Sequence, residues 1–131
     1  MKLRIQGNSL RLRLLRSEVH RLMNGGRVED TVRFAANDQA KLTYAIECAV
    51  GADRLTVRFH PGEVTVVLPP SLMQEWARGE QVGIYDSIAV GADTPLKVAI
   101  EKDFVCLDRP DVFNEDTFPN PQAAVHCDYR Q

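Results

Sequence analysis

Leucine and arginine alternate in the stretch LRLRL, residues 10–14. Alternation with a period of two is typical of a strand with one buried face, so it predicts that Arg11 and Arg13 project together from the opposite face. A guanidinium group binds phosphate both as a charge and as a forked hydrogen-bond donor. The pair therefore has the residue type and spacing to contact the phosphates of a nucleic acid. The alternative, which stays open, is an ordinary solvent-exposed strand face.

The charge changes sign along the chain. Residues 1–48 hold nine Lys or Arg against five Asp or Glu, residues 49–102 hold five against seven, and residues 103–131 hold two against six. Nucleic-acid binders usually carry a basic domain or stripe. The first segment fits that class, whereas the formal net charge of -2 for the whole chain does not.

Other chemistry has little support in the spacing of residues. The three cysteines, Cys48, Cys106 and Cys127, lack the close pairs of a zinc site. We expect no metal and no disulfide framework, although a metal or redox role for Cys106 and Cys127 stays open. No nucleophile motif or phosphate-binding glycine loop is found. These patterns predict a non-enzymatic protein without a cofactor.

The acidic segment 103–131 contains Phe113 and Phe118 among aspartates and prolines. This composition suits an extended tail that docks aromatic side chains on a protein partner. The alternative is a tail that folds back and covers apolar surface or the basic face of its own chain.

No apolar run reaches the roughly 20 residues of a membrane span, and the charged start does not resemble a signal peptide. We therefore expect a cytoplasmic protein without a membrane partner.

The elements that would position these residues occur twice. A shift of 54 positions lays residues 1–48 over residues 55–102 without a gap, and ten of the 48 pairs are identical. In both copies a serine, Ser17 or Ser71, precedes apolar residues at helical spacing, which predicts two short helices capped by these serines. Gly25 and Gly79 are predicted to end the helices in the left-handed conformation.

Each copy reads as strand, turn, strand, short helix, strand, loop, strand. The later strands are predicted near 27–34 and 41–48 in the first copy and near 81–88 and 95–102 in the second. Neither copy can cover both faces of its own sheet, so the prediction is one mainly β (α+β) barrel over residues 1–102, with pseudo-two-fold symmetry and a C-terminal extension. Such a chain would be a monomeric pseudo-dimer or a homodimer.

The stretches GNSLRLRL, SEVHRLMNGGRVED and LTYAIE resemble the swapped-hairpin DNA-binding domain of the AbrB and MazE families. The resemblance covers about residues 1–48 and, more weakly, 60–102. It implies a swapped-hairpin barrel that contacts DNA through its first turn and the following strand. Together with the arginine pattern, it predicts these DNA-binding residues: Arg4, Asn8, Ser9, Arg11 and Arg13.

The second copy departs from that motif. Pro61, Gly62 and Glu63 stand in place of G-N-S, and Val67 stands in place of the arginine. Any DNA-binding surface is therefore expected on one copy.

The basic first copy and acidic tail are similar in plan to MazE-like antitoxins, whose tail binds a toxin, and the chain also resembles a group of short bacterial proteins of unknown function. The leading hypothesis is a small DNA-binding regulator or antitoxin-like protein. The alternative is a protein-interaction or scaffold module with the same barrel that does not bind nucleic acid.

Overall fold

The computed structural model describes residues 1–104 and 116–118. Within them the strands form two four-stranded sheets, sheet A in the order β1-β2-β8-β7 and sheet B in the order β3-β4-β6-β5. The elements follow one another as β1 (Lys2–Ile5), β2 (Ser9–Leu14), α1 (Arg16–Met23), β3 (Arg27–Arg33), β4 (Lys41–Cys48), β5 (Thr56–His60), β6 (Glu63–Leu68), α2 (Pro70–Arg78), β7 (Gly83–Ile88) and β8 (Leu96–Lys102).

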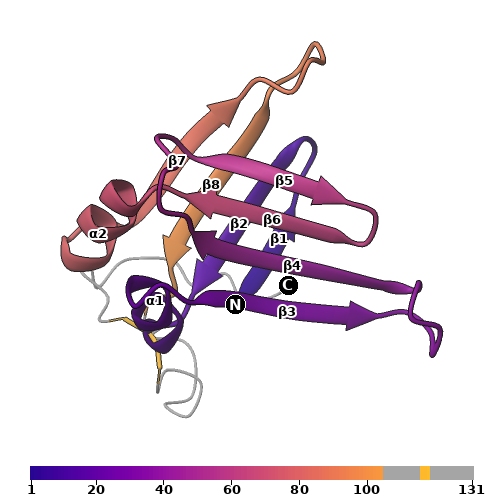
Figure 1. The fold of residues 1–131 in the computed structure, drawn as a ribbon, viewed down its shortest axis with the longest axis horizontal. Helices are drawn as coiled ribbons and strands as arrows, with labels where there is room; N and C mark the ends of the chain where they lie inside the picture. The colour runs from indigo at the N-terminus through magenta and orange to yellow at the C-terminus, as the bar shows by residue number, and fades with distance from the viewer. Residues whose placement is uncertain (105–115, 119–131) are drawn as a thin grey trace.

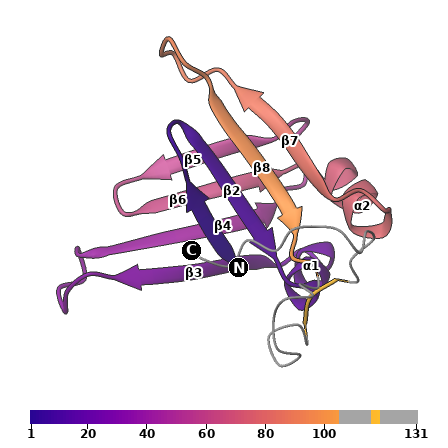
Figure 2. The same cartoon turned by 180° about the vertical axis from the view of Figure 1, so that it is seen from behind.

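The strands of the two sheets cross, and both helices lie at one end of the molecule, where β2, β4, β6 and β8 finish (Figures 1 and 2). This mainly β arrangement with two helices confirms the α+β class. The expected closed barrel is wrong. Each sheet ends in edge strands, and no strand ladder joins the two sheets within the described residues.

Elements recur along the chain by the same shift that aligns the two copies in the sequence. β2 and β6 start at the matched positions Ser9 and Glu63, and the helices start at the matched positions Arg16 and Pro70. Each sheet combines a hairpin from the first half with a hairpin from the second, joined by a parallel pair, β2 with β8 or β4 with β6. The four strands predicted near 27–34, 41–48, 81–88 and 95–102 are confirmed, with small differences at their ends.

The core lies between the sheets and beneath the helices. Alternation in the strands turns every second side chain inward, and the helices add one apolar stripe each. Trp76 of α2 is fully buried, and its indole N–H donates to the carbonyl oxygen of Val82 at 3.2 Å, so its polar atom is satisfied. The buried side chains around it include Leu12, Leu14, Leu22, Ile46, Val66, Leu68, Met73 and Ile100.

The prediction that Ser17 caps α1 is wrong, because the N-cap residue is Leu15. Asp116 of the tail supplies the acceptors instead. Its main-chain oxygen accepts from the Arg16 N–H at 2.9 Å, and its carboxylate accepts from the Ser17 N–H at 3.1 Å. A distant segment thus satisfies donors that a local serine was expected to satisfy.

Ser71 does not cap α2 either. This helix begins at Pro70 after the N-cap residue Pro69. Proline has no backbone N–H, and its fixed φ suits a first helical position, so the start of α2 has fewer donors to satisfy.

The two helix-ending glycines differ. Gly25 has φ 78° and takes the predicted left-handed conformation. Gly79 has φ -92°, so the prediction is wrong there. A Cβ at Gly79 would lie 2.7 Å from the carbonyl oxygen of Glu75, so glycine is needed for close approach rather than for backbone conformation.

Residues 116–118 of the tail lie against the same end of the molecule. The Phe118 N–H donates to the carbonyl oxygen of Asp103 at 2.8 Å, and the Phe118 ring centroid lies 6.2 Å from that of Phe104. The cationic groups of Arg16 and Lys102 lie over the Phe118 ring. Phe118, a predicted partner contact, is thus placed against its own chain. Phe113, Cys106 and Cys127 lie outside the described residues.

Candidate functional site

The outer face of sheet A gathers most of the predicted DNA-binding residues. Residues paired across strands project from the same face, so the register of the four strands places their side chains in rows. One row runs Arg4, Arg11, Ala99, Tyr85, and on one side of it lies the row Lys2, Arg13, Glu101, Gly83. On the other side Ser9, Lys97 and Ser87 align. We call these eleven residues the sheet A face.

Glu101 organises the centre of this face. Its Oε1 lies 3.4 Å from Nε of Arg11 and 3.4 Å from Nε of Arg13. Its Oε2 accepts a hydrogen bond of 2.7 Å from the Tyr85 hydroxyl. Burial and this hydrogen bond raise the pKa of Tyr85 to about 12. One carboxylate therefore fixes two guanidinium groups and a phenol that come from three strands.

The turn before β2 uses its polar groups to hold the hairpin. The Asn8 side-chain amide donates to the carbonyl oxygen of Pro95 at 3.0 Å, and the Asn8 carbonyl accepts from the Lys97 N–H at 3.1 Å. The Ser9 hydroxyl donates to the carbonyl oxygen of Gln6 at 2.5 Å. Asn8 and Ser9 thus lie beside the predicted arginines, but the contacts described here join the turn to the loop before β8.

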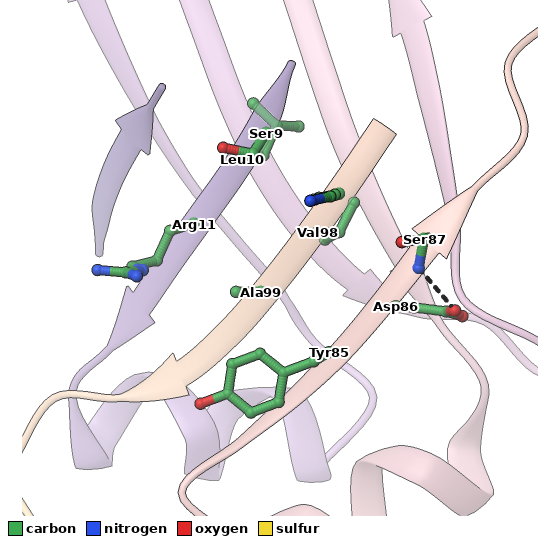
Figure 3. Close-up of a pocket in the computed structure, with 9 residues that line it drawn as sticks. Ser9, Leu10, Arg11, Tyr85, Asp86, Ser87, Val98 and Ala99 are labelled. Carbon is green, nitrogen blue, oxygen red and sulfur yellow. Dashed lines mark hydrogen bonds between the residues drawn. The ribbon is translucent and has the colours of Figure 1, made fainter. Parts of the chain in front are cut away.

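An open depression of about 560 Å³ lies over strands β2, β8 and β7. Figure 3 shows it with Arg11 on one side, Ala99 in the middle and the ring of Tyr85 on the other side. Ser9, Ser87 and Lys97 also line it. Sequence reasoning missed Tyr85 and Lys97. The alignment of the two copies does pair Tyr85 with Thr31, so their comparison offered a signal, but only the parallel pairing of β2 with β8 brings Tyr85 near Arg11.

The outer face of sheet B is neutralised by its own side chains. Arg27 lies 2.9 Å from Glu29, 2.7 Å from Glu63 and 3.4 Å from Glu47, measured between guanidinium nitrogens and carboxylate oxygens. Arg58 also pairs with Glu47. Burial opposes the charge of Arg27, but the hydrogen bonds from Glu29 and Glu63 outweigh it and raise the pKa of the guanidinium; the same contact lowers the pKa of Glu63.

The two outer faces therefore differ in charge within the described residues. The sheet A side carries five cations, Lys2, Arg4, Arg11, Arg13 and Lys97, against two carboxylates, Glu101 and Asp103. The sheet B side carries four cations, Arg27, Arg33, Lys41 and Arg58, against four carboxylates, Glu29, Asp38, Glu47 and Glu63. Both faces have Glu at the matched position, Glu101 or Glu47, but only the sheet A side has an excess of positive charge.

Two other classes of site were searched for in residues 1–104 and 116–118. No group of three His, Cys, Asp or Glu side chains there is placed to hold a metal ion. Cys48 is half-buried, and burial raises the pKa of its thiol. In the same part of the chain, every helix is too short or too polar to cross a membrane.

Comparison with known proteins gives a family but no activity. No curated protein and no solved structure matches the chain. The resemblance to the AbrB and MazE families is not shown by these comparisons, whereas the likeness to proteins of unknown function is confirmed. A family model matches residues 1–122, and the chain belongs to that family, a family of unknown function (DUF7009).

Proposed function

We propose that this protein is a small, non-enzymatic DNA-binding protein of the regulatory or antitoxin-like kind, and that it binds DNA phosphates through the sheet A face. The observation that carries the proposal is the difference between the two outer faces. Five cations stand against two carboxylates on the sheet A side, and four against four on the sheet B side. A face with excess positive charge attracts a polyanion, whereas a neutralised one does not.

The fold supports this proposal through its plan. The hairpins of the two halves are exchanged between the sheets, and the elements of the first half recur in the second. We interpret this as a duplicated swapped-hairpin unit that has opened into two sheets. In that interpretation the first copy kept the basic strand, and the second replaced Arg11 and Arg13 by Thr65 and Val67.

The glutamate at the centre does not cancel the face. Glu101 has two carboxylate oxygens and contacts Arg11 and Arg13, each at 3.4 Å. One negative charge shared by two guanidinium groups leaves a net positive charge on the pair, and their remaining N–H groups are donors for phosphate oxygens. Glu101 also holds the arginines in place, which reduces the entropy lost on binding.

The test is the salt dependence of DNA binding by the Arg11→Ala, Arg13→Ala double variant. Each phosphate contact contributes about 0.9 to the slope of log affinity against log salt concentration, so loss of both arginines should lower the slope by about 2. Fluorescence anisotropy with a labelled oligonucleotide measures the slope for the full chain. Equal affinity of the double variant and the parent at low salt would contradict the proposal.

The matched control is the Arg33→Ala, Arg58→Ala double variant. It removes the same charge from sheet B, where Arg33 pairs with Asp38 and Arg58 pairs with Glu47. It should leave the slope unchanged. An equal loss in both double variants would mean that net charge, and not the sheet A face, governs binding.

A second candidate function is a protein-interaction or scaffold module. Large apolar side chains are exposed on three edge-strand segments: Ile5 at 59 %, Phe34 at 72 % and Phe59 at 69 %. Exposed apolar side chains of this size often mark protein contacts. In-cell crosslinking should then capture a partner with the parent chain but not with a Phe34→Ser, Phe59→Ser variant, and neither arginine double variant should alter the capture.

A further inference from the structure

Tyr85 is the aromatic residue of the sheet A face, and its surroundings hold its ring in one position. The hydroxyl donates to Oε2 of Glu101 at 2.7 Å. To reach Glu101 the side chain passes over Gly83, where an added Cβ would lie 2.9 Å from the Tyr85 hydroxyl oxygen and 2.7 Å from the carbonyl oxygen of Ile100. Glycine at position 83 and glutamate at position 101 thus lay the side chain across the sheet.

The ring is nevertheless accessible. Tyr85 is 60 % exposed although its hydroxyl is bonded. Figure 3 shows the ring broadside, on the β7 side of the open depression. A fixed ring with a free face is a stacking platform, since little side-chain entropy remains to be lost when a planar group lies on it.

The groups around the ring match the other parts of a nucleotide. Ala99 separates Tyr85 from Arg11 in their row, and its small side chain leaves the floor of the depression open. Lys97 and the hydroxyl groups of Ser9 and Ser87 line the adjoining row. Strands β2 and β7 lie about 10 Å apart, two strand spacings, so cations and ring lie within the reach of one nucleotide and its neighbouring phosphate.

We infer that the depression is a subsite for one unpaired nucleotide, with the base stacked on Tyr85 and the phosphate bound by Arg11 and Lys97. The inference rests on the proposed function and adds that the DNA is single-stranded at this site. Base stacking on an aromatic side chain, combined with a basic groove, is how single strands are bound without reading base edges.

The dimensions of sheet A also favour a single strand over a duplex. The major groove of B-DNA is about 12 Å wide and admits a helix or a two-stranded ribbon. Four strands span about 14 Å between their axes before side chains are added, so a ring on β7 and cations on β2 cannot enter one groove together. In a duplex the base faces are covered by neighbouring bases, and the ring of Tyr85 would have nothing to stack on.

The experiment compares the full-chain parent with Tyr85→Leu and Tyr85→Phe variants. The probes are a labelled single-stranded oligothymidylate, a duplex of the same length and an abasic strand with the same number of phosphates, all at one salt concentration. Tyr85→Leu removes the ring and should weaken oligothymidylate binding about tenfold. Tyr85→Phe keeps the ring and should stay within about twofold of the parent. On the abasic strand the parent and Tyr85→Leu should bind equally, because no base is there to stack.

Two comparisons guard against misreading. Phe59→Leu removes an exposed aromatic ring from sheet B and should leave oligothymidylate binding unchanged. Thermal unfolding of every variant separates a binding defect from a folding defect.

The outcomes separate this inference from the proposed function. Oligothymidylate binding by Tyr85→Leu equal to that of the parent, or tighter binding of the duplex than of the single strand, overturns the subsite but leaves DNA binding by Arg11 and Arg13 standing. If the parent binds none of the probes at low salt, both the proposed function and the subsite fail.

Discussion

Glu101 joins three side chains at the residue scale, and its loss should have a spectroscopic effect. Tyr85 has a pKa of about 12 because of burial and the hydrogen bond to Glu101. A phenol whose pKa is raised in the folded state adds stability that is fully present below its unfolded value near 10. That stability is lost as the pH rises from about 10 through 12.

The first prediction is that Glu101→Gln lowers the pKa of Tyr85 toward 10, because the carboxylate no longer opposes formation of the phenolate. Ultraviolet titration of tyrosinate measures this value. The chain has three tyrosines, so the difference between each protein and its own Tyr85→Phe variant isolates Tyr85. An unchanged titration in Glu101→Gln would contradict the role assigned to the carboxylate.

The sequence predicted individual residues well where local alternation decides their placement. The outward direction of Arg11 and Arg13 follows from leucine at every second position, and the structure places both on the outer face. The carboxylate that contacts them was not predictable. Glu101 lies 88 residues from Arg13 in the chain and reaches it only through the parallel pairing of β2 with β8, and period-two patterns carry no information about which strands pair.

At the scale of elements, α1 depends on a segment far from it in sequence. The Asp116 carboxylate accepts from the Ser17 N–H and from the Ser17 hydroxyl. Helix starts have donors without intrahelical partners, and here the tail supplies the acceptors. The contact ties residues 116–118 to the end of the molecule that holds both helices.

The second prediction follows from this cap. Asp116→Ala should lower the free energy of unfolding by about 1 kcal/mol, the usual effect of losing a side-chain N-cap. Denaturant unfolding of the full chain measures it. Asp93→Ala, which makes the same change in an exposed loop, is the control and should differ from the parent by less than about 0.5 kcal/mol. Equal destabilisation by both variants would mean that the cap contributes nothing specific.

The sequence predicted the existence of the helices but not what caps them. Apolar spacing from Val19 to Met23 and from Met73 to Ala77 was sufficient to locate both helices. The serines before them were natural N-cap candidates, but the donors were satisfied by Asp116 at one helix and made fewer by proline at the other. Caps depend on neighbours in space, and a single sequence reveals these only when they are also neighbours in the chain.

At the scale of the whole molecule, neither half completes a sheet alone. Sheet A needs β1 and β2 from the first half and β7 and β8 from the second, and sheet B needs the other four strands. The internal repeat was visible in the sequence, but the exchange of hairpins was implied only by the family resemblance. An open pair of sheets differs from a barrel in how its edge strands meet, which no repeat specifies.

The third prediction is that residues 1–52 and 53–131, produced as separate chains, do not fold as monomers but assemble when mixed. Each half alone leaves the inner side of its hairpins uncovered, including Leu12 and Leu14 in the first half and Val66 and Leu68 in the second. Circular dichroism and size-exclusion chromatography should show β structure and a one-to-one complex only after mixing. Cooperative unfolding of either half as a monomer would contradict the prediction.

The exchange of hairpins also sets an order in time. During synthesis all strands of sheet B exist once residue 68 has emerged, whereas sheet A must wait for β8, which ends at residue 102. At about 5 to 20 residues per second this interval lasts seconds, and contacts between strands so far apart form slowly. The first hairpin to be made is therefore the last to be completed. During that interval the leucines of β2 are exposed to chaperones, proteases and other nascent chains, while sheet B is free to form.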